Sequence, residues 1–169
     1  MSNIAIIPAR GGSKRIPRKN IKDFLGKPIL AYSIAAALES ELFDEVMVST
    51  DDAEIAEVAT QAGAVVPFLR SSKNADDFAS TADVIIEVLN EYKKRKQVFD
   101  YACCIYPTAP FVTGTKLKEA FDVLLANNFT SVFPVAKFSY PIQRALRLVN
   151  GKVSMMQPEN LHARSQDLE

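Results

Sequence analysis

A cationic segment near the N-terminus is the part of this sequence best suited to chemistry, and it lies within "IIPARGGSKRIPRKN". Five residues between positions 10 and 19 are basic and none is acidic: Arg10, Lys14, Arg15, Arg18 and Lys19. The two glycines at positions 11 and 12 let the backbone approach a ligand closely and direct N–H groups at it. Cations, the Ser13 hydroxyl and accessible amides together make the parts of a polyphosphate-binding loop.

Two interpretations of this loop compete. It fits neither the Walker pattern nor the G-x-G-x-x-G pattern of dinucleotide sites. A solvated basic loop is the alternative, because runs of like charge are usually solvated. Nucleic-acid binding is disfavoured, since one loop offers few phosphate contacts and no aromatic pair flanks it to stack bases. Its position favours a ligand site, because the loop directly follows the first predicted strand, where open α/β sheets bind ligands.

Strands and helices alternate along the chain and must position this loop. Buried strands are predicted over residues 3–9, 45–50, 65–69, 101–106 and 131–136. Apolar stripes at helical spacing, one of them Leu30, Ile34, Ala37 and Leu38, predict helices between them. The alternation predicts a Rossmann-like three-layer α/β fold with a mainly parallel sheet. After residue 141, a strand pattern on either side of Asn150 and Gly151 predicts a hairpin.

Loops that leave the carboxyl ends of parallel strands meet near one edge of the sheet. We therefore expect the loops at 10–20, 70–81 and 106–113 to converge on one crevice. This prediction brings together three segments that lie far apart in the sequence.

Composition limits the kind of partner. The 169 residues carry 20 basic and 20 acidic side chains, so no general attraction to nucleic acid or anionic lipid is expected. No stretch reaches the ~18 consecutive apolar residues of a membrane span, and no signal peptide is expected. The two cysteines, Cys103 and Cys104, are adjacent on a predicted strand and point to opposite faces, which predicts a reduced, cytoplasmic protein.

Several longer motifs resemble the sugar-acid cytidylyltransferases, the family that includes CMP-sialic acid synthetase. They are "IIPARGGSKRIPRKNI", "GKPILAYSI", "VSTDD", "YPTAP" and "RSQDL", and the resemblance covers essentially the whole chain. It implies a nucleotide-diphospho-sugar transferase fold with a nucleotide-binding domain at residues 1–136. Residues 137–169 would form a dimerisation arm that also carries a substrate segment, so a homodimer is expected.

The resemblance implies a reaction in which CMP passes from CTP to a nonulosonic acid, with release of pyrophosphate and help from magnesium. "YPTAP" and "SYPIQRA" favour pseudaminic acid, and sialic and legionaminic acids are the alternatives. An alternative of another class is a truncated, non-catalytic nucleotide-binding module. Neither a nucleic acid nor a membrane is expected as a partner.

The resemblance also implies roles for individual residues. Arg10 and Lys19 are the expected catalytic cations, with Lys19 near the α-phosphate. The expected nucleotide-binding residues are Gly12, Ser13, Lys14, Asn20, Arg70, Ala79 and Thr81, of which Arg70 and Thr81 would contact the cytosine edge. The expected sugar-binding residues are Tyr106, Arg164 and Gln166. Without the resemblance, two interpretations of Arg70 stay open, a base-contacting residue and a surface side chain after a strand. Thr81 would then be a helix N-cap, and the alternative for Tyr106 is a residue that closes a strand.

Asp51 and Asp52 look like a metal-binding pair, but their position favours a structural role. Glu54 lies three residues after Asp51, which predicts a helix start of the capping-box type. The metal ligands are therefore unknown. By resemblance, the carboxylates that bind magnesium would lie beyond Glu169, in a part of the family's sequence from which this chain is truncated. His162, the only histidine, is expected to be a surface residue.

Overall fold

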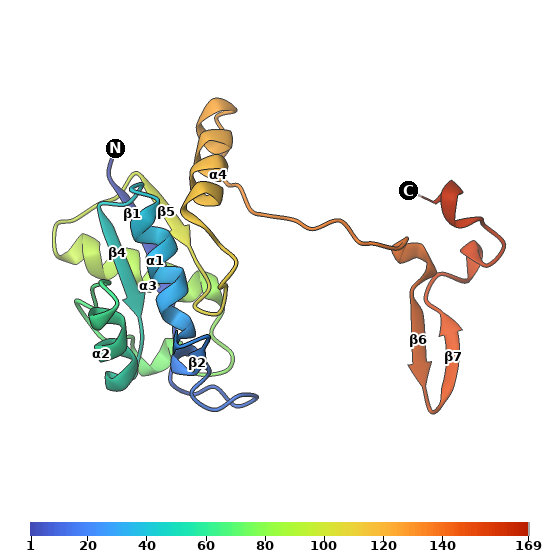
Figure 1. The fold of residues 1–169 in the computed structure, drawn as a ribbon, viewed down its shortest axis with the longest axis horizontal. Coiled ribbons are helices and arrows are strands. Elements are labelled where there is room, and N and C mark those ends of the chain that lie inside the picture. The colour runs from blue at the N-terminus through green and yellow to red at the C-terminus, as the bar shows by residue number, and fades with distance from the viewer. Residues whose placement is uncertain (169) are drawn as a thin grey trace. The chain divides into compact units, whose positions relative to one another are not determined.

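The computed structural model describes residues 1–168, and Glu169 is not described. The chain divides into two compact units, Met1–Val132 and Phe133–Glu169. Figure 1 shows the first unit as a sheet with helices packed on it and the second as a hairpin with short helical turns. The unit boundary falls a few residues before the one that the sequence suggests.

A parallel three-stranded sheet forms the centre of the first unit. Its strands are β1 (Asn3–Pro8), β4 (Glu45–Ser49) and β5 (Tyr101–Cys104), in the order β4-β1-β5. Ala5 of β1 lies opposite Val46 on one side and Cys103 on the other. All but the last residue of β1 are buried, as expected for a central strand covered on both faces. The predicted parallel sheet is confirmed.

Helices cover both faces of this sheet. They are α1 (Ile29–Glu39), α2 (Ala53–Gln61), α3 (Thr81–Lys94) and α4 (Gly114–Ala126). Because successive side chains of a strand point to opposite faces, β1 contributes to two cores. Ala5 and Ile7 pack with residues of α1 and α2, whereas Ile4 and Ile6 pack with Val88 and Tyr92 of α3. In Figure 1, α1 lies in front of the sheet and α3 behind it.

Two predicted strands are absent. Residues 65–69 form only an isolated bridge between Val65 and Met47. Pro67 follows and has no backbone N–H with which to continue the ladder. Residues 131–136 are extended but unpaired, and no strand in the described part of the chain lies beside them. Leu38, predicted on the buried face of α1, is 44% exposed.

A tight hairpin is the only strand pair among the described residues of the second unit. β6 (Leu146–Val149) pairs antiparallel with β7 (Lys152–Met155), so the predicted hairpin is confirmed. Its turn residues Asn150 and Gly151 have φ values of 49° and 74°, the left-handed conformation that two-residue hairpin turns require.

Smaller elements complete the described chain. A short antiparallel pair, β2 (Asp23–Phe24) and β3 (Lys27–Pro28), precedes α1. Single 3-10 turns occur at Lys19–Ile21, Ser72–Asn74, Ile142–Arg144, Pro158–Asn160 and Ser165–Asp167. Within residues 1–168, every helix is too short or too polar to cross a bilayer.

Candidate active site

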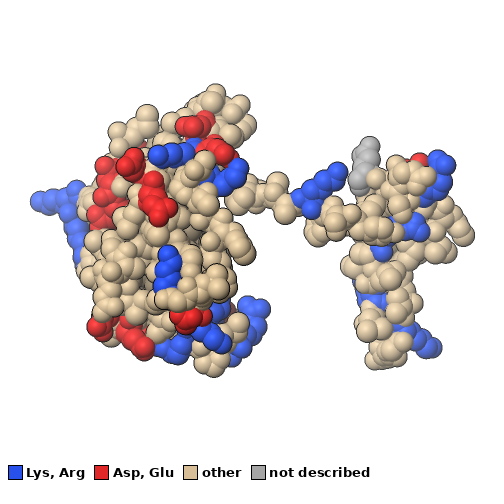
Figure 2. All heavy atoms as spheres, viewed as in Figure 1, with Lys and Arg blue, Asp and Glu red and all other residues tan. Residues whose placement is uncertain are grey.

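A cavity of about 620 Å³ lies where the loops leave the carboxyl ends of β1 and β5. Small-molecule sites usually measure about 300–1,000 Å³, so a nucleotide is within range. Residues from all three predicted loops line it, which confirms that the segments 10–20, 70–81 and 106–113 converge. Figure 2 shows basic and acidic side chains gathered at this end of the first unit, at the bottom of the view.

Most of the predicted site residues line this cavity. They are Arg10, Ser13, Lys14, Lys19, Asn20, Arg70, Ala79, Thr81 and Tyr106. Gly12 is not among the lining residues, although the space around it is open. Arg164 and Gln166 belong to the second unit, where Arg164 Nε lies 2.7 Å from Asp167 Oδ2. Arg15, for which the sequence suggested no binding role, also lines the cavity.

Two of the loop cations are paired with one carboxylate. Arg10 Nη2 lies 2.7 Å from Asp77 Oδ1, and Lys14 Nζ pairs with Asp77 Oδ2. These hydrogen bonds, the one from Lys14 first, hold the pKa of Asp77 below its usual range. Arg10 also donates to the carbonyl oxygen of Asp76. Sequence analysis missed Asp77, and the only signal was its place in a loop expected at the same crevice.

The base of the cationic loop is closed by Asn20. Its side-chain Nδ2 donates to the carbonyl oxygen of Arg10 at 2.9 Å, and the residue is 3% exposed. Its buried Oδ1 has no hydrogen-bond partner among the described residues. An unpaired buried acceptor costs free energy, and it is available to a donor that enters the site. The neighbouring Lys19 forms no ion pair in the described chain and lines the cavity, so its charge is free for a ligand.

Arg70 is a buried cation without a carboxylate partner within residues 1–168. It is 8% exposed, its Nε donates to Ser49 Oγ at 3.0 Å, and its Nη2 donates to the Ser49 carbonyl oxygen. Burial lowers the pKa of its guanidinium, while Asp51 and Glu87 act in the opposite direction from a distance. Keeping an unpaired charge buried is costly, which makes Arg70 a candidate ligand-binding residue. It is no ordinary surface arginine.

Thr81 and Tyr106 meet at the rim of the cavity. Their hydroxyl oxygens lie 3.1 Å apart, and the Tyr106 carbonyl oxygen accepts from Ser33 Oγ at 2.8 Å. The N-cap of α3 is Ser80, which forms a capping box with Asp83. Thr81 is therefore not the helix cap, and its side chain is available to the cavity.

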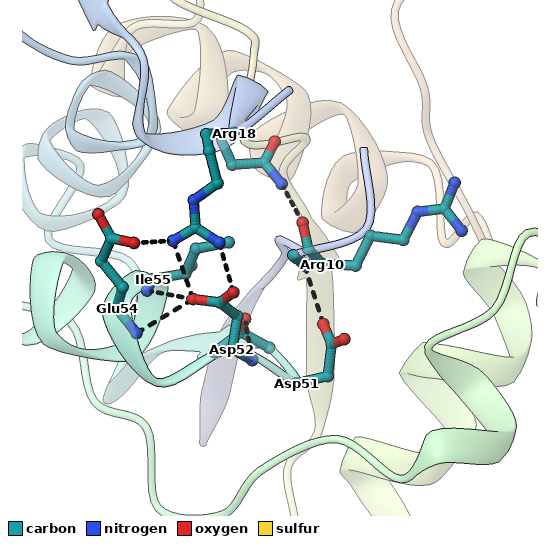
Figure 3. Close-up of polar contacts among 9 residues, drawn as sticks. Arg10, Arg18, Asp51, Asp52, Glu54 and Ile55 are labelled. Carbon is teal, nitrogen blue, oxygen red and sulfur yellow. Dashed lines mark hydrogen bonds and ion pairs between the residues drawn. The ribbon is translucent and has the colours of Figure 1, made fainter. Parts of the chain in front are cut away.

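Asp51 and Asp52 are structural, but not in the predicted arrangement. Asp52, not Asp51, is the N-cap of α2, and its Oδ1 accepts from the backbone N–H groups of Glu54 and Ile55, each at 3.0 Å. The expected capping box from Asp51 to Glu54 is wrong, because Glu54 instead pairs with Arg18 (Figure 3).

The carboxylates around the cavity do not fit a magnesium site. Within residues 1–168, no three His, Cys, Asp or Glu side chains are grouped so as to hold a metal ion. Asp51 Oδ1 accepts from the Gly11 amide, and both oxygens of Asp77 are paired with cations. Magnesium prefers six oxygen ligands, several of them water or substrate phosphate, so these residues supply little of its coordination.

Thiol chemistry is not available either. Cys103 and Cys104 are free thiols on β5. Burial raises the pKa of Cys103 to about 11 and raises that of Cys104. Since the thiolate is the reactive form, neither is a nucleophile at neutral pH.

Known proteins are similar to this chain in sequence and in fold. The family model described as cytidylyltransferase matches residues 4–161. The chain is 48% identical over 169 residues to pseudaminic acid cytidylyltransferase of Campylobacter jejuni. This match covers 99% of this chain and 73% of that protein. The chain is 38% identical over 138 residues to CMP-N,N'-diacetyllegionaminic acid synthase of Legionella pneumophila, covering 80% and 60%.

A solved structure shares the fold. It is CMP:2-keto-3-deoxy-manno-octonic acid synthetase complexed with CTP, and the TM-score is 0.63. The match covers 76% of this chain and 49% of that chain at 23% sequence identity. At that identity the likeness establishes the α/β architecture and nothing about individual site residues.

Proposed function

This chain belongs to the cytidylyltransferase family, and we propose that it transfers CMP from CTP to a nonulosonic sugar acid. In this reaction the anomeric hydroxyl oxygen of the sugar forms a bond to the α-phosphorus of CTP. The bond from that phosphorus to the oxygen that bridges it to the β-phosphate breaks, pyrophosphate leaves with the electron pair, and the hydroxyl proton passes to solvent water. Pseudaminic acid is the favoured acceptor, because the relative matched along nearly the whole chain is named for it.

The observation that carries the proposal is the gathering of cations around one cavity. Arg10, Lys14 and Lys19 line it from one loop and the buried Arg70 lines it from another. Nucleotidyl transfer leaves little covalent work to the protein, so catalysis consists mainly of alignment and charge stabilisation. This cavity has the residues for both.

Individual roles follow from position and chemistry. We propose that Arg10, Ser13 and Lys14 bind the β- and γ-phosphates, and that Lys19 stabilises charge developing at the α-phosphate. Asn20 supports this by fixing the carbonyl of Arg10 at the base of the loop.

The remaining site residues would bind the base and the sugar. Arg70 and Thr81 would bind the cytosine edge, with Ala79 beside them. Tyr106 adds an aromatic face and a hydroxyl for the sugar. Arg164 is proposed to bind the sugar carboxylate, which a guanidinium can do with two parallel hydrogen bonds, and Gln166 to contact the sugar.

Pyrophosphate release tests the proposal. The protein would be mixed with CTP, magnesium and, in parallel, pseudaminic, sialic and legionaminic acids. Release with pseudaminic acid faster than with the other two is expected. Release with none of them, together with calorimetric binding of CTP, would instead support a nucleotide-binding module without turnover.

Magnesium is proposed as an ion that enters with the substrate. Its usual protein sites combine one or two carboxylates with substrate phosphates, and since the carboxylates around this cavity supply little of its coordination, the phosphates of CTP would provide most of its ligands. Chelation should stop pyrophosphate release, and added magnesium should restore it. Release that continues at full rate in excess chelator would refute the requirement.

A homodimer is proposed because the second unit exposes much apolar surface. Leu146, Leu148 and Val153 of its hairpin are all exposed, and an isolated hairpin is marginally stable in water. Sedimentation should show a dimer at micromolar concentration, and a monomer throughout that range would contradict the proposal.

A further inference from the structure

Two consecutive aspartates contact opposite ends of the cationic loop. Asp51 and Asp52 lie in the loop between β4 and α2 and face the loop that follows β1 (Figure 3). Asp51 Oδ1 accepts from the backbone N–H of Gly11 at 2.9 Å. Asp52 binds the Arg18 guanidinium with both oxygens, Oδ2 to Nη1 at 2.5 Å and Oδ1 to Nη2 at 3.1 Å. The phosphate-binding cations Arg10 and Lys19 are the residues next to these two contact points.

The contact at Arg18 stabilises a backbone that is otherwise unfavourable. Arg18 has a φ of 53°, in the left-handed region that costs a non-glycine residue free energy. The pair with Asp52 is bidentate, with two hydrogen bonds between one guanidinium and one carboxylate, and such pairs add geometric specificity. Glu54, which is more exposed than Asp52, pairs with the same guanidinium. Two carboxylates thus neutralise Arg18, so this arginine serves to position the loop instead of attracting phosphate.

The backbone at Gly11 lies close to the Asp52 side chain. A Cβ atom at position 11 would lie 2.6 Å from Asp52 Oδ2 and 2.9 Å from Asp52 Cβ. The backbone there passes too near the aspartates for any side chain. Position 11 therefore requires glycine because of its contact with Asp52. Close approach of the backbone to a ligand would be a second reason for glycine there.

We propose that Asp51 and Asp52 are positioning residues that fix both ends of the loop, so that its cations are in place before the triphosphate arrives. The inference rests on the proposed function, since the triphosphate is the ligand for which the loop is aligned. A loop fixed in its binding conformation loses less conformational entropy on binding, which raises affinity. Asp52 also caps α2, so one side chain joins the loop to the scaffold.

Asp52→Asn separates positioning from helix capping. Asparagine caps helices about as well as aspartate, so α2 should keep its N-terminus. The amide lacks the charge and the second acceptor that bind Arg18, so the loop should lose its contact at that end. Asp122→Asn is the matched control, because Asp122 lies exposed on α4 and its loss changes the net charge equally.

Limited trypsin digestion without nucleotide reports on the loop directly. The bond after Arg15 lies in the exposed tip of the loop, between the two contact points. Asp52→Asn should be cut there several-fold faster than the wild type, and Asp122→Asn at the wild-type rate. Mass spectrometry of the fragments identifies the cleaved bond.

Calorimetry with CTP supplies the second measurement. Asp52→Asn should bind CTP about tenfold more weakly, because the ordering of the loop would now oppose binding. Glu54→Gln should have a smaller effect on both measurements, because Glu54 is 65% exposed and exposed ion pairs contribute little.

The outcomes separate this inference from the proposed function. Wild-type trypsin rates and wild-type CTP affinity in Asp52→Asn would overturn the positioning role. Failure of the wild type to bind CTP would overturn the proposed function, while the trypsin comparison would still report on the loop. If circular dichroism shows that Asp52→Asn does not fold, Arg18→Gln tests the same contact from the other side, with the Asp52 cap intact. Faster trypsin cleavage after Arg15 and weaker CTP binding are expected for that variant too.

Discussion

Arg10 and Asp77 form an ion pair across the mouth of the cavity, with Arg10 Nη2 2.7 Å from Asp77 Oδ1. Lys14 binds the other oxygen of the same carboxylate. One carboxylate is therefore paired with two of the cations proposed to bind the triphosphate. A phosphate group that enters must displace Asp77 or share its partners.

Removing the Asp77 carboxylate should strengthen nucleotide binding. In Asp77→Asn the cations lose a competing anion, so CTP affinity measured by calorimetry should rise about 3- to 10-fold. Asp122→Asn is the control for net charge and should bind CTP as the wild type does. Weaker CTP binding by Asp77→Asn would show that the carboxylate supports the ligand instead of competing with it.

A substitution at Arg70 should change the affinity for CTP much more than the stability of the fold. Arg70→Met removes a buried, unpaired charge, so the free energy of unfolding should change by less than about 1 kcal/mol. The Ser49 carbonyl oxygen keeps a donor in the mutant, because the Ala9 N–H lies 2.9 Å from it. CTP affinity should fall at least about tenfold, since a charged hydrogen-bond donor to the base is lost. Urea unfolding and calorimetry on the same sample check both statements. A large loss of stability with unchanged CTP affinity would make Arg70 structural.

Acid should weaken the fold through Asp52. The hydrogen bond from Arg18 is the main reason that the pKa of Asp52 lies below its ordinary value of 3.8. Because the native pKa is the lower one, the stabilisation is present above the unfolded value and is lost as the pH falls through the native value. The urea midpoint of the wild type should therefore fall between about pH 5 and about pH 3, and that of Asp52→Asn should fall less steeply. Parallel acid limbs for the two proteins would rule out this contribution.

Gly114 marks the closest approach of α4 to the end of α1. A Cβ atom there would lie 2.9 Å from the backbone nitrogen of Ser40 and 3.1 Å from the carbonyl carbon of Glu39. Backbone atoms cannot move aside cheaply, so Gly114→Ala should destabilise the protein by about 1–3 kcal/mol in urea unfolding. Gly12→Ala is the comparison, because no atom lies within 4 Å of its added Cβ, and it should leave the stability nearly unchanged. Equal stabilities for the two variants would contradict this packing.

The sequence predicted the sheet, its helices and the position of the cavity because these depend on local patterns. The apolar run at residues 3–9 is buried on both faces, as a central parallel strand must be. Convergence of the three loops followed from chain direction alone. The segments at 65–69 and 131–136 were predicted as strands because they are apolar and branched, but a strand also needs a neighbour with which to pair. Sequence pattern does not report that neighbour.

Partners distant in sequence account for what was missed at the site. No local pattern indicated that Asp77 would pair with Arg10, or that Asp52 and not Asp51 would cap α2. Both depend on how loops from different strands meet after folding. The charge of each residue was visible in the sequence, but the choice of its partner was decided by tertiary packing.

The central claim is that the cations of the loop bind the triphosphate of CTP. The most direct test compares the affinities for CTP and CMP by calorimetry, in the wild type and in a double variant, Arg10→Gln with Lys14→Gln. The wild type should bind CTP at least about tenfold more tightly than CMP, and the double variant should lose most of that preference, because CMP lacks the phosphates these cations would bind. A double variant that binds CTP as tightly as the wild type would contradict the claim.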